Sequence, residues 1–168
     1  MRIMIFWRTF LESIKLPQKK ALFKLNRTGM DIVVIYMFIL LLFVSLPNLL
    51  QQIFNKADLS LEIDTFFLII YFFIFYYLPM VVIVFLVISL IAYIGVGIAK
   101  IMKRKLRFAI LWKMIAFTTT IPFTLYVLLT LFFHLSDTFL LLSLLYTFIL
   151  LIKMISIYPK RRQRPKKT

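Results

Sequence analysis

The chain has 168 residues, of which 63% are hydrophobic and only 16% charged, and its mean hydropathy is +1.00. Soluble domains contain about 45–50% apolar residues, so this composition predicts an all-α integral membrane protein. The absence of cysteine excludes disulfides, thiolate catalysis, cysteine-ligated zinc and iron–sulfur clusters. The net charge of +15 lies in three blocks beside apolar segments, which favours anionic inner-leaflet lipid over nucleic acid as the partner.

Residues 1–29 predict a basic cytoplasmic segment that begins with an amphipathic helix. Apolar side chains recur there at helical spacing, with polar and charged side chains on the opposite face. The apolar positions are Ile3, Phe6, Trp7, Phe10, Leu11 and Ile14, and the opposite face holds Arg8, Thr9, Glu12 and Lys15. This pattern is typical of an interfacial helix that lies among the lipid headgroups and ends at Pro17. The alternative is a helix packed on the protein's own spans.

A membrane domain is predicted over residues 30–158, and its first span covers residues 32–50. Asp31 stands at the cytoplasmic start of this span, where a carboxylate favours a helix N-terminus. Residues 51–65 are predicted to form the extracytoplasmic loop, in which Lys56 stands among acidic residues.

The stretch from Phe66 to Ala99 contains no charged residue and is interrupted only by Pro79. Residues 80–99 are long enough for one span, whereas residues 66–77 are rich in aromatic side chains that suit the outer membrane interface. Either residues 66–77 continue the helix through a kink at Pro79, or they lie along the outer surface. We favour one kinked, tilted helix, because proline is tolerated where the freed carbonyls find other partners.

Two further spans are predicted at residues 114–133 and 138–157, after a basic loop at residues 100–113. Pro122 predicts a second helix kink. The threonines just before it, Thr118–Thr120, are better explained by hydrogen bonds to their own helix than by a substrate path.

Four spans place all three basic blocks on the cytoplasmic side of the plasma membrane, together with both termini. All 21 basic residues except Lys56 then lie inside, in agreement with the positive-inside rule. A fifth span would move the loop at residues 100–113 outside. We expect inner-leaflet lipid contacts from this loop and from the basic tail at residues 159–168. The residues concerned are Lys100, Lys103, Arg104, Lys105, Arg107, Lys160, Arg161, Arg162, Arg164, Lys166 and Lys167.

Catalysis is not indicated by the residues inside the predicted spans. No charged residue or histidine lies in the centre of a span, so a proton relay or carboxylate dyad has no residues to use. His134 and Asp137 share a turn that could hold a cation, but such groups more often form a simple polar loop. We therefore expect no enzyme, no metal and no cofactor. Gly95 and Ala99 are spaced for close helix packing.

Two segments resemble a known family. These are FWRTFLESIKLPQKKALFKLNRTGMDIVVIY at residues 6–36 and KRKLRFAILWKMIAFTTTIPFTLYVLL at residues 103–129. They are similar to a family of Firmicute membrane proteins without an assigned function, labelled maltodextrin-utilisation-associated and grouped near the Yip-type membrane proteins. The resemblance implies a membrane protein of a Gram-positive bacterium and implies no mechanism.

These features predict a non-catalytic accessory or regulatory subunit that binds another integral membrane protein, or a second copy of itself, through its helices. The alternative is a small permease component or carrier for a lipid-like or apolar substrate. A carrier of that kind needs no buried charge and could use the kinks at Pro79 and Pro122.

Overall fold

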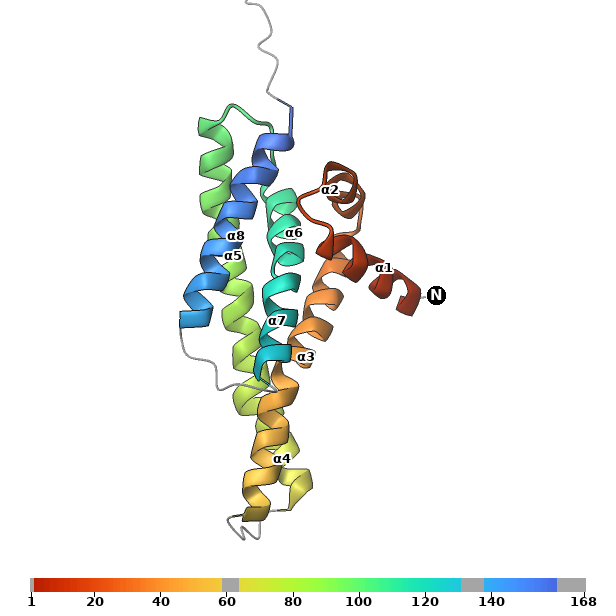
Figure 1. Cartoon of the computed structure of the whole chain (residues 1–168), viewed down its shortest axis with the longest axis vertical. Helices are drawn as coiled ribbons and strands as arrows, with labels where there is room; N and C mark the ends of the chain where they lie inside the picture. The colour runs from red at the N-terminus through yellow and green to blue at the C-terminus, as the bar shows by residue number, and fades with distance from the viewer. Residues whose placement is uncertain (1, 59–63, 131–137, 160–168) are drawn as a thin grey trace, which may run out of the picture.

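The computed structural model describes residues 2–58, 64–130 and 138–159, and this part of the chain contains helices and no strand (Figure 1). The helices are α1 (Arg2–Ile14), α2 (Lys19–Asn26), α3 (Met30–Asp58), α4 (Thr65–Phe72), the π-helical turn η1 (Phe73–Tyr77), α5 (Leu78–Ile101), α6 (Phe108–Thr118), α7 (Thr120–Thr130) and α8 (Thr138–Ile157). Three helical stretches are long and apolar enough to cross a membrane, namely Met30–Phe54, Thr65–Ile101 and Phe108–Thr130. Leu141–Ile157 within α8 is a shorter apolar helix.

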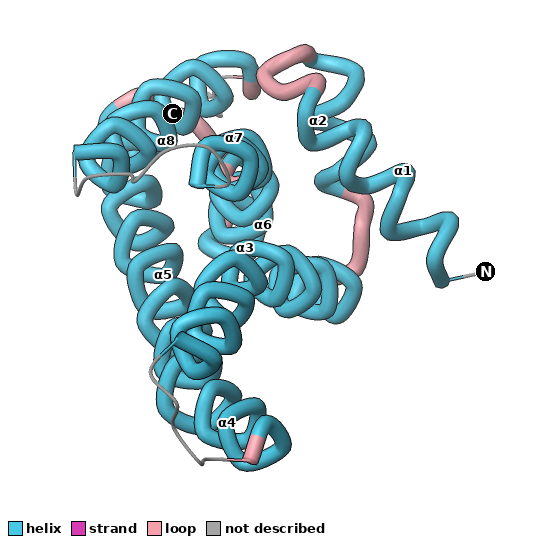
Figure 2. The backbone as a smooth tube through the Cα atoms, turned by 60° about the horizontal axis from the view of Figure 1, so that its bottom comes forward, coloured by secondary structure: helices cyan, strands magenta, loops and turns pink. Residues whose placement is uncertain are grey.

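The central rod of the bundle is α6 followed by α7, with α3, α5 and α8 around it (Figure 2). In the most apolar 18-residue segment of Phe108–Thr130, 56% of the residues are buried, whereas the corresponding share for Thr65–Ile101 is 28%. Side chains from four helices fill the core between them. They include Val33 and Met37 of α3, Ala92 of α5, Leu111 and Ile115 of α6, and Leu151 and Ile155 of α8, all without exposed surface.

α3 is longer than the span predicted at residues 32–50, because it continues to Asp58. The prediction of a loop over residues 51–65 is therefore wrong for residues 51–58. Neither glycine nor proline interrupts this segment, and Gln52 Nε2 donates a hydrogen bond to Asn48 Oδ1 one turn earlier at 2.7 Å. The helix can thus extend beyond the apolar residues that define the span.

α4, η1 and α5 form one continuous helix through Pro79, which is the arrangement favoured from the sequence. Asp64 caps its start by accepting a hydrogen bond from the Phe66 backbone N–H at 3.3 Å. Pro79 lacks an N–H, and its ring would collide with the carbonyl four residues earlier in a regular helix. The wider turn at Phe73–Tyr77, directly before Pro79, makes room for the ring.

α6 begins at Phe108, so the predicted start of the third span at residue 114 is wrong, and the basic loop shortens to residues 102–107. Lys113 consequently lies inside a helix. A turn at Thr119 separates α6 from α7, close to Pro122. α8, in contrast, has the bounds expected from the sequence, Thr138–Ile157.

The end of α5 is a Schellman turn with a lysine at the position that normally holds glycine. The Lys103 N–H donates to the Lys100 carbonyl at 3.0 Å, and the Arg104 N–H donates to the Ala99 carbonyl at 2.8 Å. Lys103 has a φ of 54°, in the left-handed region. This conformation costs a residue with a Cβ about 1–2 kcal/mol.

Lys103→Gly is therefore expected to raise the free energy of unfolding in detergent by about 1 kcal/mol, because glycine adopts a positive φ without strain. Urea unfolding followed by circular dichroism measures this change. Lys103→Ala is the matched control, since it removes the same charge but keeps the Cβ. Equal stabilisation by both variants would attribute the effect to charge and would contradict the prediction.

Candidate functional site

One edge of α1 packs against the bundle, which corrects part of the predicted amphipathic pattern. Thr9 and Ser13 are buried, and the Phe6 ring lies 5.2 Å from the ring of Tyr36 in α3. Thr9 had been assigned to the polar outer face, but it faces the protein. The Ser13 hydroxyl donates to the Thr9 carbonyl at 2.7 Å, so this buried polar group is satisfied within α1.

The other edge of α1 is apolar and open. Trp7, Leu11 and Ile14 are 62%, 44% and 45% exposed, Phe10 is half-buried, and the side chain of Ile3 lies outside the described residues. One edge of the helix therefore packs on the spans, which is the alternative that the sequence allowed, and the interfacial placement of the open edge stays a prediction.

Tyr36 and Thr120 form a buried hydrogen bond that the sequence analysis did not identify. The two hydroxyl oxygens are 2.7 Å apart and join α3 to α7. The neighbouring hydroxyls of Thr118 and Thr119 donate to carbonyls of their own helix, those of Met114 and Ala116, both at 2.8 Å. Thr118 and Thr119 thus bond to their own helix, as the sequence predicts, whereas the Thr120 hydroxyl bonds to Tyr36 of another helix, which the sequence did not predict.

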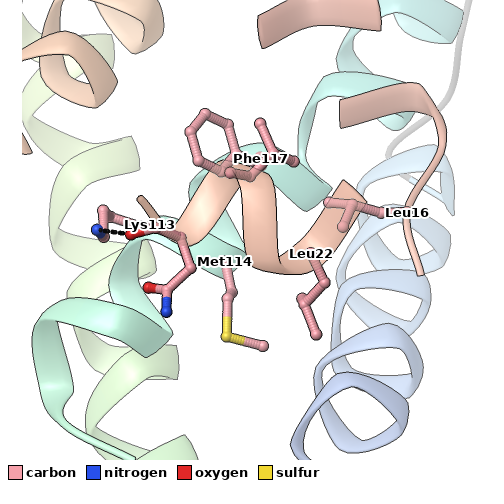
Figure 3. A pocket seen from close by; sticks show the side chains of 7 residues that line it. Leu16, Leu22, Lys113, Met114 and Phe117 are labelled. Atoms are coloured by element: carbon pink, nitrogen blue, oxygen red, sulfur yellow. Dashed lines mark hydrogen bonds between the residues drawn. The ribbon is translucent and has the colours of Figure 1, made fainter. Parts of the chain in front are cut away.

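Lys113 connects α6 to the end of α2 (Figure 3). Its Nζ donates hydrogen bonds to the carbonyls of Asn26 at 2.6 Å and Thr28 at 3.0 Å. Carbonyls at and after the end of a helix have no N–H partner within that helix, so Lys113 supplies the missing donor. Leu22 and Met114 lie beside it, and the crevice between them is too narrow for a water molecule. The sequence predicts Lys113 in the basic loop instead, because nothing local shows that Asn26 lies next to it.

The basic residues around the end of α5 are exposed except for Arg104, which is hydrogen-bonded to α8. The exposed members are Lys100, Lys103, Lys105 and Arg107. Arg104 is half-buried, and its Nη1 donates to the Tyr158 carbonyl at the end of α8. Arg104 therefore ties the loop to α8, whereas the other four side chains are free to reach lipid. The predicted contacts of the tail, at residues 160–168, lie outside the described residues.

Gly95 lies where α5 packs against α6 and α8. A Cβ added there would lie 3.2 Å from Leu151 Cδ2 and 3.6 Å from Leu111 Cδ1, and Ala99 one turn later is also buried. The small residues thus serve packing within this chain. Gly97 faces open space, with nothing within 4 Å of an added Cβ.

The described residues contain no group of three or more histidine, cysteine, aspartate and glutamate side chains placed to hold a metal. The turn with His134 and Asp137 lies outside them. No family model, curated protein or solved structure matches this chain. Its candidate functional surfaces are consequently identified by geometry: the open edge of α1, the exposed basic loop, and the faces of the long helices that the bundle leaves uncovered.

Proposed function

We propose that this protein crosses the plasma membrane four times, with both termini in the cytoplasm, and acts as a non-catalytic accessory or regulatory subunit of another integral membrane protein. In this proposal α8 is the fourth span, since its 20 residues reach about 30 Å, the thickness of a hydrocarbon core. The bond from Arg104 to Tyr158 supports the topology, because it holds the basic loop beside the end of α8, after which the basic tail follows in the sequence.

Cysteine labelling is expected to report this topology. A membrane-impermeant maleimide should label Asp64→Cys in intact cells and Lys105→Cys only after lysis, because positions 64 and 105 are exposed just beyond opposite ends of the continuous helix Thr65–Ile101. The native chain has no cysteine to interfere and serves as the control. Labelling of position 105 in intact cells would contradict the four-span arrangement.

The observation that carries the accessory role is an apolar stripe on the continuous helix Thr65–Ile101. We call it the outer stripe, and its members recur every three or four residues and are 50% to 75% exposed. They are Phe67, Tyr71, Phe75, Leu78, Val82, Leu86, Leu90 and Tyr93. The stripe presents one long apolar face away from the bundle.

The helix that carries the outer stripe is longer than a bilayer is thick, although the stripe itself, residues 67–93, covers only about 39 Å of it. The helix has 37 residues, about 55 Å, and at a typical tilt of about 20° it extends about 52 Å along the membrane normal. A bilayer with its headgroups measures about 40–45 Å. Figure 1 shows α4 and the end of α3 projecting beyond α7 and α8 at the lower end. Apolar surface in that projection gains free energy from being covered by protein, which supports a partner with a membrane span and an outer extension.

Site-specific photocrosslinking in native membranes tests the proposal. A photoreactive side chain at Phe75, in the outer stripe, should give one discrete protein adduct. The matched control is Leu145 of α8, which is 57% exposed on a different face, and it should give lipid adducts only. Lipid adducts alone at both positions would contradict a partner on the stripe.

The carrier alternative has a separate test. Substrate-dependent flux through liposomes that contain only the purified chain would support the carrier and contradict the accessory role. The resemblance to the Firmicute family is part of the proposal as well, and it supports a Gram-positive plasma membrane as the location.

A further inference from the structure

A cleft of about 400 Å³ opens between α1, α2 and the start of α3. This volume is in the range of small-ligand sites. Figure 2 shows the backbone of α1, α2 and α3, with a loop that leads from α2 into α3. Its lining includes the charged residues Arg8, Glu12, Lys24 and Arg27 and the apolar residues Leu25 and Ile32.

The lining has an excess of positive charge from three separate places in the chain. Arg8 comes from α1, Lys24 from α2 and Arg27 from the turn after α2. Glu12 forms an ion pair with Lys24, and the hydrogen bond from Lys24 lowers the pKa of Glu12, so that its carboxyl stays ionised at neutral pH. Among the described residues, Arg8 and Arg27 form no such ion pair.

The carboxylate of Asp31 lies beside Gly29 at the edge of the cleft and does not line it. The lining of the cleft therefore has three cationic side chains, Arg8, Lys24 and Arg27, and one carboxylate, that of Glu12. Guanidinium groups donate paired hydrogen bonds to the oxygens of phosphates and carboxylates alike, so two arginines at one cleft suit an anionic group of this kind. At a membrane surface the abundant group of this kind is the phosphate of an anionic lipid.

The depth of the cleft in the bundle suits a lipid headgroup. α1 contacts Tyr36, which lies about 8 Å along α3 from the charged residue Asp31. An interfacial helix typically sinks about 5–10 Å into the boundary between headgroups and acyl chains. The open edge of α1, with Trp7 exposed, continues from the cleft toward lipid, and Leu25 and Ile32 add apolar lining.

We propose that this cleft binds the phosphate of one anionic phospholipid, with Arg8 and Arg27 as the phosphate ligands. Leu25 and Ile32 contact the glycerol and the first acyl methylenes. This site is separate from the basic loop and tail, which contact the leaflet as a charged surface. A free phosphate compound shares the headgroup chemistry but lacks the acyl chains that the apolar lining and the open edge of α1 would receive.

Native mass spectrometry of the full chain in detergent tests this site with short-chain phosphatidylglycerol as the probe and phosphatidylcholine as the neutral comparison. We expect one tightly held phosphatidylglycerol. The double variant Arg8→Gln with Arg27→Gln should weaken it about tenfold or more, because each basic group near an anionic headgroup contributes about 1 kcal/mol. Arg8→Lys with Arg27→Lys keeps the charge but loses the paired guanidinium donors, so its affinity for phosphatidylglycerol should lie between those of the native chain and the glutamine variant, which would also show that the site is folded.

The matched control is Lys105→Gln with Arg107→Gln, which removes the same charge from exposed positions of the basic loop. It should leave the tightly held lipid in place. Equal weakening by both glutamine pairs would show a general charge effect and overturn the proposal, as would equal retention of phosphatidylcholine. Complete competition by glycerophosphoglycerol or inorganic phosphate at equal concentration would identify a soluble phosphate as the ligand and overturn the lipid assignment.

Discussion

Gly95→Leu is expected to lower the free energy of unfolding in detergent by about 1–3 kcal/mol, the usual cost of overpacking a filled core. An added Cβ already lies 3.2 Å from Leu151 Cδ2 and 3.6 Å from Leu111 Cδ1, so a leucine must push α5 away from α6 and α8. Leu151 and Leu111 have no exposed surface and therefore little room to move. Urea unfolding followed by tryptophan fluorescence measures the loss, since Trp112 packs in the same core.

Gly97→Leu is the matched control for this prediction. It adds the same side chain to the same helix two residues later, where nothing lies within 4 Å of the new Cβ. Both variants gain helix propensity, by about 0.5–1 kcal/mol, so their difference isolates the packing cost. Similar stability of the two variants would show that α5 does not approach α6 and α8 as closely as the structure has it.

Lys113→Met is expected to release α2 from the bundle. It removes two hydrogen bonds from a charged donor, each contributing about 1.5–3 kcal/mol, and leaves the carbonyls of Asn26 and Thr28 without their donor. Methionine keeps an unbranched side chain of similar length, so the packing beside Leu22 and Met114 changes little. Hydrogen exchange should accelerate in α2 and the following turn, with α8 unchanged.

Lys105→Met provides the control, because it removes the same charge from an exposed position in the basic loop. It should leave exchange in α2 unchanged. Faster exchange throughout the bundle in Lys113→Met, or the same pattern in Lys105→Met, would contradict a local role for Lys113 as the cap of α2.

The sequence by itself determined the helical membrane class and the main apolar helices. A helix of about 20 apolar residues satisfies its own backbone hydrogen bonds and matches the hydrocarbon thickness, so its position can be predicted locally. α8 shows this most clearly, since its predicted and observed bounds agree. The uninterrupted apolar run around Pro79 likewise indicated one continuous helix, and the structure has it.

The tertiary structure alone decided the features that depend on residues far apart in the chain. Lys113 lies within α6, where its ammonium group donates hydrogen bonds to the carbonyls of Asn26 and Thr28. Arg104 points inward because its guanidinium group donates a hydrogen bond to the Tyr158 carbonyl. Thr9 became buried because the side of α1 that carries it packs on the bundle. The physical reason is the same in each case. The hydropathy of a stretch of neighbouring residues is enough to predict an apolar helix. The hydrogen-bond partner of a buried donor or charge lies elsewhere in the chain and becomes its neighbour only when the helices pack.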